Sequence, residues 1–142
     1  MTLKDSLCAV ELFCELPDDL AEEVIARGST VSVAPGVPVV NQGDRGAGMV
    51  MLIEGTADVV VDGRVVGSLS TGDYFGEMSL IDGSGRTATV MSGPDGLRAF
   101  RLSPTAFTSL IDQHPHVAML LLKGLVARVR RLEAQDTGPA GG

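Results

Sequence analysis

The chain has 142 residues, of which 44% are hydrophobic and 4% aromatic, and its 18 glycines favour one folded domain with many turns over a disordered chain. A net charge of −7 argues against nucleic-acid binding as the main activity, because contact with a phosphate backbone depends on clustered Lys and Arg. No signal peptide and no apolar run near the ~20 residues of a membrane span is evident, so we expect a cytoplasmic protein without membrane contact.

The first regular segment is expected to be helical. Residues 7–26 carry apolar residues at helical spacing, and Gly28 supplies a stop signal. Cys8 and Cys14 lie within this segment. Six residues apart on one helix they would point to different faces, which predicts two buried free thiols.

Residues 30–102 change to a β pattern. Short runs rich in Val, Ile and Leu are separated by turn signals, among them Glu54-Gly55-Thr56, Asp62-Gly63 and Gly93-Pro94. The Asp62-Gly63 pair suits the positive φ angles of a tight hairpin. About eight short strands at regular spacing predict a small sandwich or barrel, because closing a sheet removes its exposed edges.

Two helices are expected after the β region. Ser103 and Pro104 have the pattern of an N-cap followed by proline in the first helical position. This helix should end near His114, because Pro115 disfavours a helical conformation in the residue before it. The two histidines around Pro115 have no further ligands at suitable spacing, so no metal site is predicted.

The last helix should run from Pro115 to about Ala134. Its apolar residues follow spacings of four and three, typical of a two-stranded coiled coil: Ala118, Leu122, Leu125, Val129 and Leu132. This seam predicts either a dimer or packing on the same domain. The neighbouring face, which could meet the barrel, holds Val117, Leu121, Gly124 and Arg128. We expect one domain over residues 1–135 and a disordered tail over residues 136–142.

The segment "FGEMSLIDGSGRTATV", residues 75–90, carries the candidate chemistry. A short helix beginning at Gly76 would leave backbone N–H groups for an anion. The guanidinium of Arg86 suits two phosphate oxygens, whereas ionised Glu77 can only accept hydrogen bonds and suits a sugar hydroxyl. The hydroxyl of Thr87 can reach a phosphate or a base. These groups fit a sugar phosphate, and the alternative is a Glu77–Arg86 salt bridge that closes the loop.

The order Phe-Gly-Glu, eight residues, Arg-Thr-Ala-Thr-Val resembles the phosphate-binding cassette of the cyclic nucleotide-binding domains. Such domains occur in catabolite-activator-type regulators, in regulatory subunits of cAMP-dependent kinase and in cyclic nucleotide-gated channels. The resemblance extends to "APGVPVVNQGD", "IEGTADV", "STGDYFGE" and the C-terminal helices, and covers roughly residues 7–133. It implies a mainly β fold with flanking helices: an eight-stranded double-stranded β-helix of jelly-roll type, N-terminal helices and two C-terminal helices.

The resemblance also implies roles for single residues. Glu77 matches the residue that binds the ribose 2′-hydroxyl, and Arg86 matches the one that binds the cyclic phosphate. Four further positions match residues that line the phosphate: Gly76, Ser79, Thr87 and Ala88. The last helix would form a lid over the base, with Arg128 as a base contact. A threonine at the position of Thr87 is found in members of the family that prefer cGMP, where its hydroxyl can bridge the phosphate and the guanine.

The function implied is a non-catalytic regulatory domain that binds cAMP, or alternatively cGMP, and needs no other cofactor. Movement of its C-terminal helices would signal to a partner chain or within a homodimer, because no effector domain follows in this sequence. The alternative is an interaction module of the same fold that binds no nucleotide. A metalloenzyme of the cupin type is disfavoured, since residues 30–102 contain no histidine.

Overall fold

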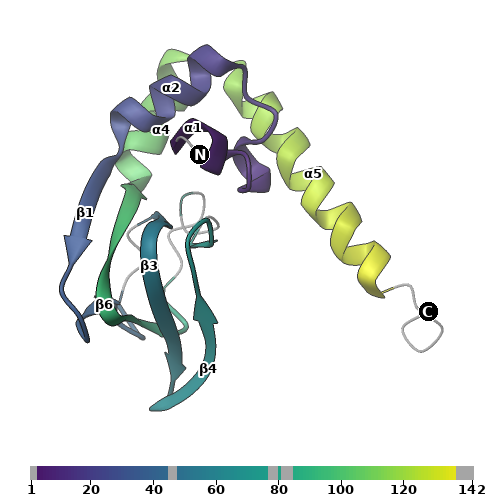
Figure 1. Ribbon diagram of the computed structural model, residues 1–142. Coiled ribbons are helices and arrows are strands. Elements are labelled where there is room, and N and C mark those ends of the chain that lie inside the picture. The colour runs from purple at the N-terminus through teal and green to yellow at the C-terminus, as the bar shows by residue number, and fades with distance from the viewer. Residues whose placement is uncertain (1–2, 45–47, 77–79, 81–84, 137–142) are drawn as a thin grey trace.

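The computed structural model describes residues 3–44, 48–76, 80 and 85–136, and consists of one antiparallel sheet with helices gathered at one of its ends (Figure 1). Helices from both ends of the chain meet there, and the last one extends away from the sheet (Figure 1). Among the described helices, none combines the length and the apolar character needed to cross a bilayer. The predicted fold class, mainly β with N-terminal and C-terminal helices, is confirmed.

The sheet has six strands in the described part of the chain. They are β1 (Ser29–Val33), β2 (Pro38–Val40), β3 (Met49–Val61), β4 (Arg64–Leu69), β5 (Tyr74–Phe75) and β6 (Thr89–Leu102). The order is β1-β6-β3-β4, with β2 also paired to β6 and β5 also paired to β3, and every pairing is antiparallel. Strand β6 therefore joins most of the sheet.

The prediction of about eight short strands is not what the described residues show, because two expected turns lie inside long strands. Glu54-Gly55-Thr56 lies within β3 and Gly93-Pro94 within β6. The β3–β6 register shifts on either side of this region, between Leu52 and Glu54 and between Gly55 and Ala57. Gly55 has φ +94° and a Cβ there would lie 2.9 Å from Cα of Leu97. The glycines thus mark bulges that bend a continuous strand.

The predicted hairpin at Asp62-Gly63 is confirmed. It joins β3 to β4, with Val61 opposite Arg64, and both turn residues have positive φ, 51° and 80°. Positive φ at both central positions is the requirement of a type I′ turn, whose twist matches that of the strands. An Asp-Gly pair satisfies it at little steric cost.

The N-terminal segment forms three short helices: α1 (Leu3–Leu7), the 3-10 helix η1 (Glu11–Phe13) and α2 (Asp18–Arg27). Gly28 ends α2 as predicted, and its N–H donates to the carbonyls of Val24 and Ile25. The prediction of two buried free thiols is wrong. Cys8 and Cys14 are exposed and joined by a disulfide, with Cα atoms 4.2 Å apart, because α1 ends at Leu7 and the turn after it doubles the chain back.

The C-terminal helices confirm the predicted boundaries closely. Helix α4 spans Pro104–Gln113, and the Ser103 hydroxyl caps it by accepting from the N–H of Ala106 at 3.1 Å. His114 is the C-cap of α4, and α5 spans Val117–Asp136. Most of the tail predicted to be disordered, residues 137–142, lies outside the described residues.

Two hydrophobic clusters share strand β3. One lies at the helical end and includes Met49 and Met51 together with residues from α1, η1, α2, α4 and α5. The other is formed by the sheet itself and includes Val50 and Leu52. Because successive side chains of a strand point to opposite faces, the first half of β3 is buried on both sides. The sheet and the helices are therefore packed on the same few residues.

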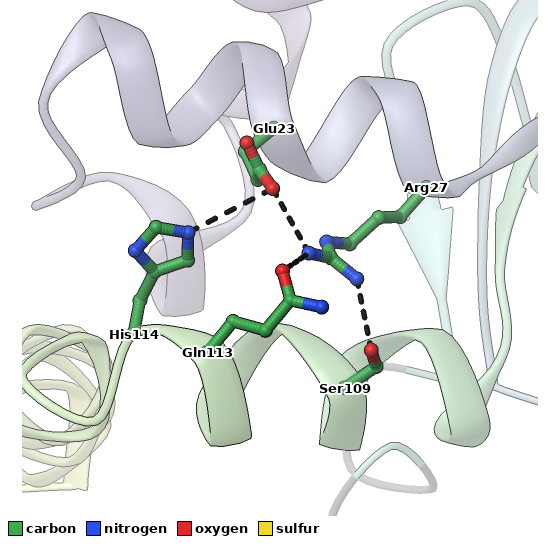
Figure 2. Close-up of polar contacts among 5 residues, drawn as sticks. All are labelled: Glu23, Arg27, Ser109, Gln113 and His114. Atoms are coloured by element: carbon green, nitrogen blue, oxygen red, sulfur yellow. Dashed lines mark hydrogen bonds and ion pairs between the residues drawn. The ribbon is translucent and has the colours of Figure 1, made fainter.

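A polar contact also links α2 to α4 (Figure 2). Arg27 reaches across from α2: Nη1 donates to Oγ of Ser109 at 3.0 Å, and Nη2 donates to Oε1 of Glu23 at 2.9 Å and to Oε1 of Gln113. Nε2 of His114 lies 3.7 Å from Oε1 of the same Glu23. One half-buried arginine thus fixes the C-terminal half of α4 against the N-terminal segment.

Replacing Arg27 by Ala should lower the free energy of unfolding by about 2 kcal/mol, because three groups lose a charged donor at a half-buried position. Urea denaturation with circular dichroism measures the change. Lys4→Ala is the matched control, since Lys4 pairs with Glu22 at 3.3 Å at a more exposed site and should cost no more than about 0.5 kcal/mol. Equal losses in both variants would contradict the structural role given to Arg27.

Candidate functional site

Arg86 is positioned by its backbone. Its N–H donates to the carbonyl of Asp44 at 2.8 Å, and its carbonyl accepts from the N–H of Gly43 at 2.9 Å. These two bonds tie the chain before β6 to the turn after β2. The side chain is therefore held at the sheet, where only 9% of the residue remains exposed.

The guanidinium of Arg86 lies in a pocket of backbone and aromatic groups. Nη2 donates to the carbonyl of Gly48 at 2.7 Å, and Cζ lies 5.7 Å from the ring centroid of Phe75. Nε is buried and has no hydrogen-bond partner among the atoms that the structure describes. We call Gly48, Phe75, Gly76 and Arg86 the arginine cradle.

Burial lowers the pKa of Arg86 from its ordinary value, and the positive charge of Arg101 lowers it further. Both effects mean that the protonated side chain is destabilised where it lies. A buried cation with an unsatisfied donor is normally compensated by an anion or by further hydrogen bonds. The cradle can therefore accept an anion that supplies both charge and acceptor oxygens.

Gly76 closes the cradle at a point where no side chain fits. Its φ is +80°, and a Cβ would lie 3.3 Å from Cζ of Arg86 and 2.5 Å from the carbonyl oxygen of Gly48. The glycine therefore serves two purposes, a left-handed backbone and a close approach to the guanidinium. The structure brings Gly76 and Arg86 together, as expected from the sequence.

The structure describes some of the other predicted site residues and leaves others outside the described part of the chain. Thr87 is exposed and Ala88 half-buried, and both follow Arg86 directly along the chain. Glu77 and Ser79 lie outside the described residues, so the Glu77–Arg86 salt bridge stays an alternative. Arg128 belongs to the C-terminal half of α5, which lies away from the sheet (Figure 1).

Sequence reasoning did not identify two members of the cradle. Phe75 belongs to the quoted motif, but its ring was not given a role. Gly48 contributes its backbone carbonyl to the cradle. Every residue has such a carbonyl, so the residue type does not reveal which one accepts a hydrogen bond. Its φ of +101° explains why glycine is present, since few other residues adopt that conformation.

Comparison with known proteins shows the family of the chain. Residues 30–114 match the cyclic nucleotide-binding domain. A Pycsar effector protein, XpPycTIR of Xanthomonas perforans, is 32% identical over 122 residues, which are 82% of this chain and 40% of that protein. A cAMP-dependent protein kinase regulatory subunit of Mycosarcoma maydis is 39% identical over 84 residues, which are 54% of this chain and 16% of that protein.

Among solved structures, the N-terminal domain of a transcriptional regulator from Streptomyces coelicolor A3(2) superposes with a TM-score of 0.78 at 26% identity. The match covers 87% of this chain and 94% of that domain. The chain belongs to the cyclic nucleotide-binding domain family. It spans less than half the length of the curated relatives named above.

Gly76→Ala should lower the free energy of unfolding by about 3 kcal/mol, for two reasons. The new methyl group would clash with a backbone carbonyl, and alanine would be held at a positive φ that strains its backbone. Gly63→Ala is the matched control. Gly63 has the same φ of +80°, but nothing lies within 4 Å of its Cβ position, so only the strain of about 1 kcal/mol remains. Chemical denaturation of both variants separates the two effects, and equal losses would show that Gly76 has room for a side chain.

Proposed function

We propose that this chain is a non-catalytic regulatory domain that binds a cyclic nucleotide and passes the signal on through its C-terminal helices. The observation that carries the proposal is the buried Arg86 guanidinium, held against Gly76 and Gly48, whose Nε has no hydrogen-bond partner among the described residues. An anionic phosphodiester would offset the desolvation of this cation and accept its remaining hydrogen bond. The match of residues 30–114 to the cyclic nucleotide-binding domain supports the same ligand class.

In this proposal the cyclic phosphate binds to Arg86 and to four neighbouring positions: Gly76, Ser79, Thr87 and Ala88. Glu77 accepts a hydrogen bond from the ribose 2′-hydroxyl, a role that suits an ionised carboxylate. Thr87 and Arg128 contact the base. Arg128 can do so only after α5 moves toward the sheet, because α5 now packs against η1 and α4.

The proposed ligand is cAMP, with cGMP as the alternative. The hydroxyl of Thr87 is exposed next to Arg86, where it could bridge a phosphate and a guanine, and this feature favours cGMP. The kinase regulatory subunit of Mycosarcoma maydis, whose name refers to cAMP, supports cAMP. Parallel titration with both nucleotides decides between them.

The proposed signal travels through the core at the helical end. Leu80, in the segment between Gly76 and Arg86, is 4% exposed and belongs to the same cluster as Leu110 of α4 and Val117 of α5. Gly76 and Arg86 already lie together, so a phosphate bound to both would act by shifting the segment that holds this leucine, and α4 and α5 would then repack around it. The ligand can drive this change only as far as it binds the repacked state more tightly.

Calorimetric titration of the pure protein with cAMP and cGMP tests the ligand. Arg86→Ala should weaken binding at least about 100-fold, because a buried charged donor is lost, whereas Arg128→Ala should weaken it about tenfold or less. Arg98→Ala is a control that should leave binding unchanged, since Arg98 lies in β6 and pairs with Glu54 on the surface at 3.2 Å. Equal losses for Arg86 and Arg128 would show that the phosphate is misplaced. Absence of heat and of a thermal shift at millimolar nucleotide would leave the nucleotide-independent interaction module.

The partner proposed for α5 is a second copy of this chain. The predicted seam is exposed at Leu122 and Val129, and also at Leu132. Ala118 and Leu125 are half-buried, and Leu125 packs against the helical-end core, so the exposed stripe is rotated slightly from the seam and also includes Met119 and Val126. Arg130 and Glu133 border the same apolar groove. In a two-fold pair of helices these opposite charges could face each other across the stripe.

A double substitution, Leu122→Lys with Val129→Lys, should abolish this dimer by placing two charges in an apolar seam. Light scattering after size exclusion should show a change from twice the chain mass to the chain mass of 14.7 kDa. Val65→Lys with Val66→Lys, on the equally exposed strand β4, is the matched control and should remain dimeric. A wild-type chain that is monomeric at about 100 µM would contradict the proposal.

A further inference from the structure

We propose that Cys8 and Cys14 form a reversible thiol–disulfide site whose oxidation state controls how firmly α4 and α5 are seated on the N-terminal segment. The proposal does not depend on nucleotide binding. It rests on three features of the described structure: the position of the disulfide, the residues enclosed by it, and the hollow beside it.

The disulfide closes a short loop, and side chains of this loop pack against the C-terminal helices. Val10, Leu12 and Phe13 lie between the two cysteines and are 0%, 2% and 2% exposed. The Phe13 ring meets the Phe107 ring of α4 edge to face, with centroids 6.5 Å apart. Helix η1, which contains Leu12 and Phe13, also packs directly against α5.

The same core residues that hold α5 therefore belong to a covalently closed loop. Val117 and Leu121 of α5 are 0% and 4% exposed in the cluster that contains Leu12 and Phe13. A closed loop of this length has far fewer conformations than the open chain. Reduction of the disulfide would allow the loop more conformations and would weaken its packing against α5.

The disulfide is open to a reagent, although the residues that it encloses are not. Both cysteines are exposed and border a hollow of about 260 Å³ that is also lined by Lys4, Phe13 and Asp18. The Lys4 ammonium favours a thiolate nearby, and it also pairs with Asp18 at 4.0 Å, so the charge of the hollow is mixed. A small dithiol, or the dithiol of a protein reductant, is the chemical class that this site would accept.

The reaction is ordinary thiol–disulfide exchange. A thiolate of the dithiol attacks one cysteine sulfur, the S–S bond breaks, and a mixed disulfide forms while the other cysteine leaves as a thiolate. The second thiol of the reagent then attacks the mixed disulfide and releases the first cysteine. Two electrons and two protons pass from the dithiol to Cys8 and Cys14, and the dithiol becomes a disulfide.

The test treats the oxidised 142-residue chain with dithiothreitol in native buffer, followed by thiol alkylation and mass spectrometry. We expect two alkylated thiols without denaturant, and a Tm lower by about 5–10 °C. Hydrogen exchange at residues 117–121 of α5 should become faster, whereas residues 57–61 of β3, far along the sheet, should not change.

A variant with both Cys8→Ser and Cys14→Ser should match the reduced chain in Tm and in exchange, and should not respond to dithiothreitol. This variant separates loss of the disulfide from other effects of the reagent. Reduction that requires denaturant would overturn the proposal, as would reduction that leaves the exchange of residues 117–121 unchanged. Neither outcome bears on whether the chain binds a nucleotide.

Discussion

The candidate site is built around the burial of one cation. The guanidinium of Arg86 is removed from water by Gly48, Gly76 and Phe75, and its pKa is lowered by that burial and by Arg101. A cation in this position is unfavourable by itself, since removing charge from water costs more than one carbonyl returns. In the proposed function, a bound anion offsets this cost. Positive φ at Gly48 and Gly76 allows the backbone to come close enough for this purpose.

The sheet and the helices share packing through strand β3. Strand β3 directs Met49 and Met51 to the helical-end cluster and Val50 and Leu52 to the sheet cluster. A displacement at the cradle cannot be absorbed by empty space, because interiors of this kind are close-packed. The N-terminal segment takes part in the same cluster, and Arg27 and the Cys8–Cys14 loop hold it against α4 and α5. At the helical end, the N-terminal segment, the sheet and the C-terminal helices therefore pack together in one cluster.

The sequence predicts the local features of this fold well and its long-range features less well. The Ser103 cap, the Gly28 stop and the Asp62-Gly63 turn follow from interactions within a few residues, and all three are confirmed. Gly55 and Gly93 look like turn residues in the sequence, but a bulge and a turn require the same residue type, and only the pairing partner distinguishes them.

The candidate site shows the same division. The spacing of Gly76 and Arg86 predicts an anion site, and this stays a prediction, although the structure places the two residues close together. The Gly48 carbonyl and the disulfide are contacts between segments, and neither is determined by residue type alone. The C-terminal half of α5 lies away from the sheet in this structure, so the role of Arg128 in a lid is a proposal.

The pairing of β6 has a consequence for how the chain is made. Strand β6 pairs with β1, β2 and β3, so Ser29 meets Arg101 and Val50 meets this same residue on its other side. On the ribosome, β1 and β2 emerge long before the strand that completes their hydrogen bonds. Such non-local pairing folds slowly and leaves apolar strands exposed for longer. The β3–β4 hairpin joins neighbouring segments of the chain through a two-residue turn, so it is the part of the sheet that can form before β6 is made.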